Sequence, residues 1–180
     1  MITMDFETKG IDGNTMSNPP EPVGLAVMDE GCEPEYWDVN DPYYQGLMKE
    51  IWLGDEDMLW QNGWGFDLCV AKKWLGLPFP DWHRVHDTQF LLYLADPHSP
   101  SLGLKPSAIH YLDWEVEAQD ELHDWVMANV PEATEKGWGA FIWRAPWEIV
   151  AKYAKDDVRM TRALFDELHP LHGGIYAESL

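Results

Sequence analysis

The stretch Met4-Asp5-Phe6-Glu7-Thr8, close to the amino terminus, places two carboxylates two residues apart. In a β-strand, side chains at positions i and i+2 leave the same face, while the side chain between them leaves the opposite face. Asp5 and Glu7 would then stand side by side, with Phe6 turned into a core. Two like charges held this close repel each other, and a hard divalent cation with oxygen ligands relieves that repulsion. A solvated strand edge is the alternative for this stretch alone.

A second acidic position follows a later strand, in Trp60-Gln61-Asn62-Gly63-Trp64-Gly65-Phe66-Asp67-Leu68. The short apolar run Met58-Leu59-Trp60 predicts a strand end, and Asn62-Gly63 is a turn signal. From Phe66 the apolar residues recur with helical spacing. Asp67 is therefore predicted in the first turn of a helix, just past a strand. For this residue alone, capping and the helix dipole explain an aspartate there better than a functional role.

The third acidic element is the run from Pro146 to Leu168. Pro146 suits the first position of a helix and Pro170 would end it, which predicts one long terminal helix. Tyr153 and Asp157 lie four residues apart and share a face of that helix. For this pair alone, a core-edge tyrosine beside an ordinary surface acid is the alternative.

Composition bounds the domain organisation. A chain of 180 residues that is 46% hydrophobic, with 11 tryptophans, can bury one substantial core. We therefore expect a single domain over residues 1–180, with a core over about 1–168 and a short tail over 169–180.

Cys32 and Cys69 predict free thiols in a reducing compartment. Because no apolar run approaches membrane-spanning length, we expect no membrane partner, and no Gly-rich phosphate loop supports an NTPase.

Taken together, the three segments occur in the order and at about the separations of one family. Asp-x-Glu, Asn-x-x-x-Phe-Asp and Tyr-x-x-x-Asp-Val make the chain resemble the DEDD exonuclease superfamily, in its tyrosine subclass (DEDDy). His86–Pro97 resembles the family's Asp-Thr helix, and Ser101–Leu112 resembles its Ser-Leu-x-x-Leu-Ala-x-x-Tyr-Leu element. The resemblance covers about Met1 to Leu168, although Asp113–Arg144 matches only loosely. Within this superfamily, the chain most resembles the proofreading exonuclease domains of phage-type family-A DNA polymerases.

The resemblance implies an α/β, RNase H-like fold and a two-metal 3′→5′ exonuclease. Two divalent cations, Mg²⁺ or Mn²⁺, about 3.5–4 Å apart would activate a water and stabilise the charge that builds on the phosphate. In the family's arrangement Asp5 bridges both metals, and Glu7 and Asp157 complete the site that binds the attacking water. Asp67 supports the second metal. Tyr153 orients the water, because a hydroxyl with an ordinary pKa of about 10 is too weak a base to deprotonate it unaided.

Residues that flank the acids are the candidates for substrate contact: Phe6, Thr8, Asn62, Trp64 and Phe66. For Trp64, stacking on a terminal base and packing against the protein remain open. Lys152 stands where the histidine subclass places its general base, so Tyr153 fixes the subclass.

The implied substrate is a single-stranded or frayed DNA 3′ end, which is shortened with release of nucleoside monophosphates. The enzyme would be free-standing or the proofreading part of a polymerase, in the cytoplasm of a bacterium or a phage-infected host. An RNase D-like 3′→5′ exoribonuclease is the alternative within enzymes, since those relatives share every motif quoted. An inactive nuclease-like module, serving as a nucleic-acid-binding or interaction platform, is the alternative of another class.

The charge of the chain works against a nucleic-acid substrate. Lys+Arg 12 against Asp+Glu 32 gives a formal net charge of −20, which repels a polyanion. Metal–phosphate contacts and aromatic stacking at a single-stranded end would then hold the substrate. A polymerase domain or a replication partner could add binding, and growth at high internal salt would also account for the acidity.

The periodicity predicts a mixed five-stranded sheet with helices on both faces. The predicted strands are Ile2–Glu7, Val23–Met28, Glu35–Val39, Met58–Gln61 and Val85–His86. The predicted helices are Tyr43–Leu53, Phe66–Leu75, Thr88–Leu94, Pro106–Tyr111, Gln119–Asn129 and Pro146–Leu168.

Overall fold

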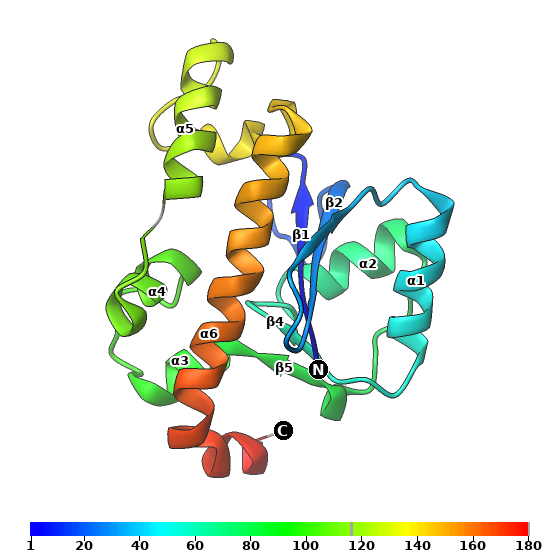
Figure 1. Cartoon of the computed structure of the whole chain (residues 1–180), viewed down its shortest axis with the longest axis vertical. Coiled ribbons are helices and arrows are strands. Elements are labelled where there is room, and N and C mark those ends of the chain that lie inside the picture. Colours follow the sequence, from blue (N-terminus) through cyan, green and yellow to red (C-terminus); the bar gives the residue numbers. More distant parts are fainter. Residues whose placement is uncertain (116, 180) are drawn as a thin grey trace.

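A five-stranded sheet forms the centre of the molecule (Figure 1). The structure, a computed structural model, describes residues 1–115 and 117–179, with side chains for 1–115 and 121–172. The strand order is β3-β2-β1-β4-β5, and β1 pairs antiparallel with β2 and parallel with β4, so the sheet is mixed, as predicted. The strands are β1 (Ile2–Thr8), β2 (Pro22–Asp29), β3 (Glu35–Trp37), β4 (Met58–Trp60) and β5 (Val85–Asp87).

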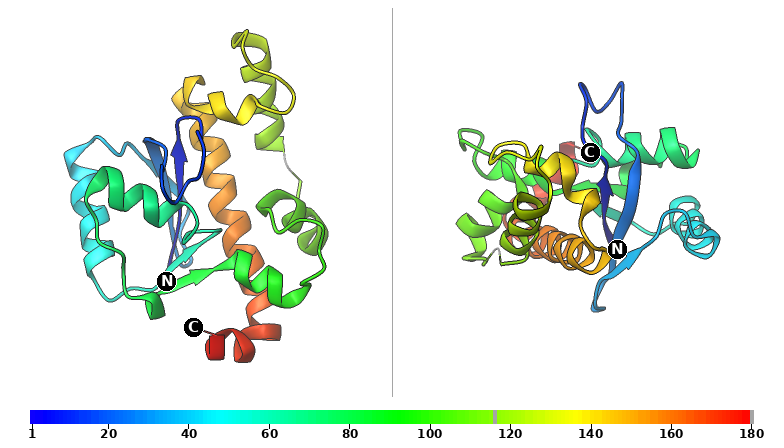
Figure 2. Two further views of the ribbon diagram at one scale, coloured as in Figure 1. Left: turned by 180° about the vertical axis from the view of Figure 1, so that it is seen from behind. Right: turned by 90° about the horizontal axis from the view of Figure 1, so that it is seen from above.

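Helices cover both faces of this sheet (Figures 1 and 2). On one face lie α1 (Pro42–Leu53) and α2 (Asp67–Leu75), and on the other lies the long helix α6 (Trp147–Ser179). Beside α6 are α3 (Thr88–Ala95), α4 (Leu104–Leu112) and α5 (Glu117–Asn129), and the short 3₁₀ helices are η1 (Trp82–Arg84) and η2 (Trp138–Arg144). The predicted α/β architecture is confirmed.

The alternation along β1 sorts its side chains between the two faces. Met4 and Phe6 belong to the core beneath α1 and α2, where the Phe6 ring stacks on Trp60 at 6.0 Å between centroids. Asp5 and Glu7 therefore leave the strand toward α6, side by side, as the period of two predicts. Burial of the apolar set on one face thus fixes where the two carboxylates point.

Helix α6 is longer than the sequence predicts. Its buried stripe runs from Val150 to Leu168, but the helix continues through Pro170 to Ser179. The prediction that the helix ends before Pro170 is therefore wrong for residues 169–179, and Leu180 lies outside the described residues. A proline inside a helix removes one backbone hydrogen bond and bends the axis without having to end the helix. The red end of α6 turns away from its orange part in Figure 1.

Other differences are local. Strand β3 ends at Trp37 instead of Val39, and α4 begins at Leu104, two residues before the predicted start. Trp147, at the start of α6, is exposed, and the centroid of its ring lies 4.5 Å from that of Tyr36. Both cysteines are free thiols, as predicted. None of the helices in the described part of the chain is both long and apolar enough to cross a membrane.

Candidate metal centre

Three carboxylates converge where β1 passes beneath α6. Asp5 and Glu7 come from β1 and Asp157 comes from α6, and each offers an oxygen within 4.8 Å of the other two. Helix α6 runs along β1 in the views of Figures 1 and 2, which brings together residues from opposite ends of the sequence. Carboxylate oxygens at this spacing are the ligands that Mg²⁺ and Mn²⁺ take in proteins, so the donor set fits a divalent cation.

Burial is the largest cause that raises the pKa of each of the three acids. Burial, then the charge of Asp157, raises the pKa of Asp5 from 3.8 to about 7. Burial and the neighbouring charges of Asp5 and Asp157 raise the pKa of Glu7 well above its ordinary value. The cause in each case is a negative charge that is poorly solvated and close to another. Such a cluster favours protons at low pH and a cation at neutral pH.

The fourth predicted acid, Asp67, lies beside this group and has a different local role. It is buried at the first position of α2, and its Oδ1 accepts a hydrogen bond of 3.0 Å from the backbone N–H of Phe6. Burial, followed by the charge of Asp5, raises its pKa well above the ordinary value. Asp67 therefore ties α2 to β1 directly behind the converging acids.

Tyr153 lies one helical turn before Asp157, and its hydroxyl is near enough to that carboxylate to act as a donor to it and to lower its pKa. Burial and the nearby carboxylates raise the pKa of Tyr153 far above 10, because the phenolate would add another negative charge. The side chain thus remains a neutral hydroxyl. It can orient a water molecule through a hydrogen bond, but it cannot remove a proton from it.

Lys105 completes the cluster, and the sequence did not reveal it. From the first turn of α4 its ammonium pairs with Asp157 Oδ1 and lies 4.1 Å from the centroid of the Tyr153 ring. Its charge opposes the rise in the pKa of Asp5, Glu7 and Asp157. The only available signal was its place within the Ser101–Leu112 element, where it looks like an ordinary helical lysine.

A cavity of about 410 Å³ opens over the carboxylates. Thr8, Ile11 and Phe66 line it on the side of β1 and α2, whereas Gly139 and Ala140 of η2 line the opposite side. A Cβ atom at Gly10 would lie 2.9 Å from the carbonyl oxygen of Ala140, so a glycine lets these two segments approach. The wall from η2 belongs to the stretch Asp113–Arg144, and the sequence did not predict it.

The loop that leads into α2 is held by Asp87. The Asp87 carboxylate accepts the backbone N–H of Asn62 at 2.9 Å and that of Gln89 at 2.9 Å, and it also accepts those of Gly63 and Trp64. Asn62 has a left-handed φ of 61°, which asparagine tolerates better than most residues. Asp87 is thus a positioning residue for the loop, although the sequence indicated only a helix start there.

A second cavity, of about 380 Å³, lies beside this loop. Its lining residues include the aromatic side chains Trp64, Phe90 and Tyr93, together with Asn62.

The predicted substrate-contact residues therefore divide between two places. Thr8 and Phe66 line the first cavity, and Asn62 and Trp64 line the second. The Phe6 side chain is only 3% exposed in the core, so its backbone is what borders the first cavity.

The fold has clear relatives among solved structures. No protein-family model matches the sequence, and no curated protein matches it significantly. The chain superposes on the crystal structure of the Aedes aegypti Nibbler EXO domain with a TM-score of 0.63 and 15% identity, over 97% of this chain and 80% of that chain. A structure described as "apo form of the nuclease" gives a TM-score of 0.61 and 16% identity, over 99% of this chain and 77% of that one.

At these identities the similarity concerns the fold. The chain has the RNase H-like α/β fold of exonuclease domains, with a cluster of three acids on the face that α6 covers.

Proposed function

We propose that the protein is a metal-dependent 3′→5′ exonuclease of the tyrosine subclass. It would hydrolyse phosphodiester bonds at single-stranded or frayed DNA 3′ ends and release nucleoside monophosphates, as a free-standing enzyme or as the proofreading part of a polymerase. The observation that carries the proposal is the convergence of Asp5, Glu7 and Asp157, with the Tyr153 hydroxyl one turn away, on an exonuclease-type fold.

The residues divide the chemistry among them. Asp5, Glu7 and Asp157 would hold divalent cations, Mg²⁺ or Mn²⁺, with Asp67 at the edge of the site. When bound, these ions supply the acidification of a water molecule and the neutralisation of charge on the phosphate. The Tyr153 hydroxyl orients the attacking water, because its raised pKa keeps the proton in place for hydrogen bonding.

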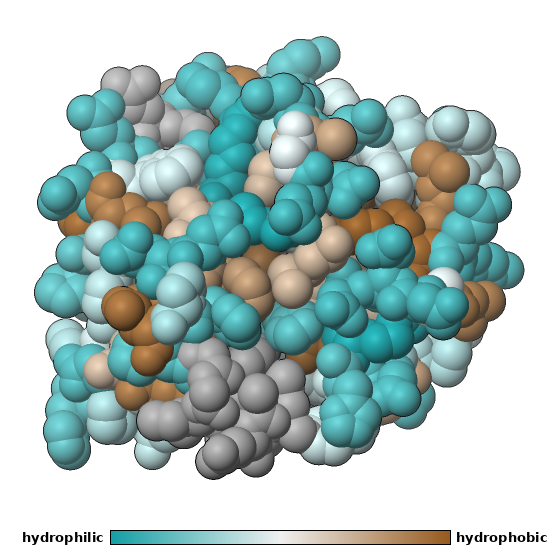
Figure 3. Space-filling model, turned by 60° about the horizontal axis from the view of Figure 1, so that its bottom comes forward, coloured by the Kyte–Doolittle hydropathy of each residue, from teal (hydrophilic) through white to brown (hydrophobic). Residues whose placement is uncertain are grey.

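Substrate contact on the protein side would be largely aromatic. Trp64, Phe90 and Tyr93 line the second cavity, and stacking of a base on an aromatic ring contributes about 1–3 kcal/mol. The surface in Figure 3 is mostly hydrophilic, with hydrophobic side chains in separate patches, and the net charge is −20. Because duplex DNA has a denser negative charge than a single strand, this acidity favours a single-stranded end.

Cleavage of matched single-stranded DNA and RNA oligonucleotides labelled at the 5′ end tests the proposal. We expect a ladder that shortens from the 3′ end with Mg²⁺ or Mn²⁺, and none with EDTA. Asp5→Ala should abolish the ladder, whereas Asp55→Ala, which removes an exposed acid of the loop after α1 that is not part of the cluster, should leave it unchanged. Tyr153→Phe should slow cleavage without weakening Mn²⁺ binding.

Three outcomes of the same experiment would count against part or all of the proposal. Persistent cleavage by Asp5→Ala would refute the metal centre. Intact protein that cleaves neither substrate with either metal would favour the inactive binding module, and faster cleavage of RNA than of DNA would reassign the substrate to RNA.

A further inference from the structure

An exposed aromatic and basic surface lies next to the second cavity, on the side of α2. It consists of Trp64, Lys72 and Phe79, and is termed the Trp64–Phe79 surface below. The two rings lie 6.1 Å apart between centroids at an interplanar angle of 48°, and the Lys72 ammonium lies 4.2 Å from the centre of the Phe79 ring. Trp64 is 37% exposed and Phe79 is 44% exposed, so folding leaves much of both rings in contact with water.

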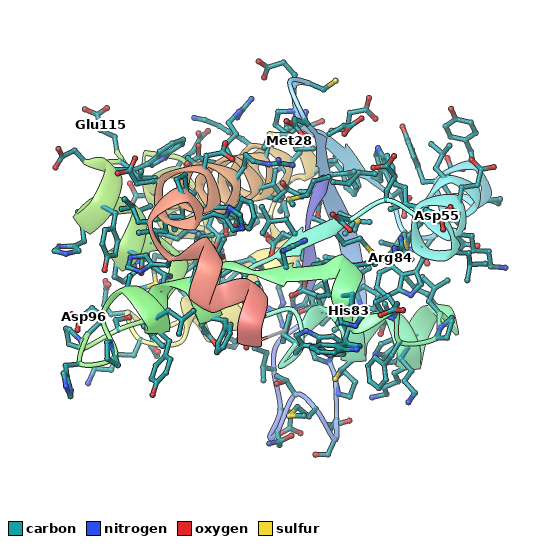
Figure 4. All side chains as sticks on the ribbon, turned by 90° about the horizontal axis from the view of Figure 1, so that it is seen from below. Met28, Asp55, His83, Arg84, Asp96 and Glu115 are labelled. Atoms are coloured by element: carbon teal, nitrogen blue, oxygen red, sulfur yellow. The ribbon has the colours of Figure 1, made fainter. Side chains whose placement is uncertain are left out.

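The backbone beneath these rings is firmly held. The carbonyl oxygen of Pro78, directly before Phe79, accepts a 2.6 Å hydrogen bond from Nε1 of the buried Trp52. At the far end of the same segment, Arg84 donates to the carbonyl oxygens of Trp52 and Glu56, at 3.3 and 2.6 Å. Figure 4 shows Arg84 on the same side of the molecule as Asp55, and Asp55 belongs to the segment after α1. The surface is therefore a preformed platform, since Asp87 holds Trp64 through its loop.

The charge of this surface is opposite to that of the whole molecule. The chain has Lys+Arg 12 against Asp+Glu 32, and many of the described cations are paired with carboxylates. Within the part of the chain that the structure describes, Lys72 makes no such ion pair, and its ammonium lies over a ring instead. A cation beside exposed rings is the combination with which proteins hold single-stranded nucleic acid, by phosphate contact and base stacking.

We propose that the Trp64–Phe79 surface binds a stretch of single-stranded nucleic acid that continues beyond the nucleotide at the candidate metal centre. This inference rests on the proposed function, which places part of the substrate in the second cavity. Trp64 lines that cavity and also belongs to the surface, so the two adjoin at this residue. Bases stack on Trp64 and Phe79, and Lys72 contacts a phosphate. The surface compensates locally for the negative charge of the rest of the molecule.

Binding of an oligonucleotide in EDTA, where no cleavage can occur, tests the role proposed for the Trp64–Phe79 surface. Fluorescence anisotropy with a 5′-fluorescein oligothymidylate of about 15 nucleotides, a length that spans such platforms, gives the affinity and its salt dependence. We expect Lys72→Glu to weaken binding at least about fivefold and to reduce the slope of log affinity against log salt by about one. Phe79→Leu, which keeps an apolar side chain but removes the ring, should weaken binding at least about fivefold, and Phe79→Tyr should restore it. Lys155→Glu on α6 is the control with the same change in charge.

A second measurement separates this inference from the proposed function. Hydrolysis of a dinucleotide with Mn²⁺ engages the metal centre alone, so Lys72→Glu and Phe79→Leu should leave its rate unchanged while raising KM for the long strand. Equal losses on both substrates would mean that the variants disturb the centre, and would overturn the inference. Wild-type-like binding by both variants would overturn it too, and the exonuclease could still be active.

Two further outcomes complete the test. If the intact protein cleaves neither substrate but its binding depends on Lys72 and Phe79, the surface stands and the exonuclease proposal falls. If binding is unchanged and a dimer in solution is lost on Phe79→Leu, the surface is a contact between two copies of the chain.

Discussion

Replacing Lys105 by methionine should destabilise the metal-free protein strongly. The Lys105 side chain is 16% exposed and that of its partner Asp157 is 9% exposed, so the pair is largely shielded from water. Removal of one partner from a buried ion pair costs about 3–5 kcal/mol, because the other charge is left uncompensated. Methionine keeps an unbranched stem against the Tyr153 ring, and Asp157 can take up a proton. We therefore expect the lower end of that range, about 3 kcal/mol.

A divalent cation should reverse most of this loss. A loss of about 3 kcal/mol lowers the Tm of a chain of this size by about 6–12 °C. Mn²⁺ bound by Asp5, Glu7 and Asp157 would replace the missing positive charge at the cluster. The gain in Tm between EDTA and Mn²⁺ should therefore be larger for Lys105→Met than for the unaltered protein, as measured by circular dichroism.

The matched control is Lys155→Met, which removes a lysine of α6 that is not part of the cluster. If both variants lose equal stability in EDTA, the electrostatic reasoning is refuted. A double-mutant cycle with Asp157→Asn provides the second check, because the effect of Lys105→Met should shrink once its partner is neutral. An undiminished effect would trace the loss to packing of the methionine.

Three further expectations follow from the same contacts. In EDTA, stability should fall between about pH 4 and about pH 7, because Asp5 has a pKa of about 7 when folded against 3.8 when unfolded. Between these pH values the folded state keeps a proton that the unfolded state has lost, so stability is lost as the pH rises through the range. A denaturant titration that shows constant or rising stability would contradict this. Asp87→Ala should cost about 3 kcal/mol by leaving several partly buried N–H groups unpaired, with faster hydrogen exchange at Asn62 as the readout. Arg162→Met should cost about 1–2 kcal/mol, because Arg162 donates to Thr3 Oγ1 at 3.0 Å and to the Met1 carbonyl oxygen at 2.6 Å. If Arg162→Met unfolds at the same denaturant concentration as the wild type, this link between α6 and β1 contributes nothing to stability.

Those parts of the fold that depend on local periodicity could be predicted from the sequence. The alternation in β1 places Asp5 and Glu7 on one face because Met4 and Phe6 must be buried on the other. The i, i+4 spacing places Tyr153 on the same side of α6 as Asp157. In both cases the separation along the chain is short, so one element decides the geometry.

The remainder depends on packing between distant segments, which no local pattern encodes. Lys105 resembles any other lysine in a first helical turn until α4 packs against α6 and brings it to Asp157. The role of Asp87 requires two neighbouring parallel strands, since its hydrogen bonds cross from β5 to the loop after β4. Pro170 is a local signal that was misleading, because helix α6 continues through it.

The pairing of β1 with α6 also determines when the centre can form during synthesis. Arg162 and Thr3 are 159 positions apart in the sequence, yet they are hydrogen-bonded across the same interface that joins Asp5 to Asp157. A nascent chain on the ribosome exposes Asp5 and Glu7 early but has neither Tyr153 nor Asp157 until α6 emerges from the exit tunnel. Until α6 emerges and packs on β1, such a chain lacks Asp157, so the three-carboxylate cluster is incomplete.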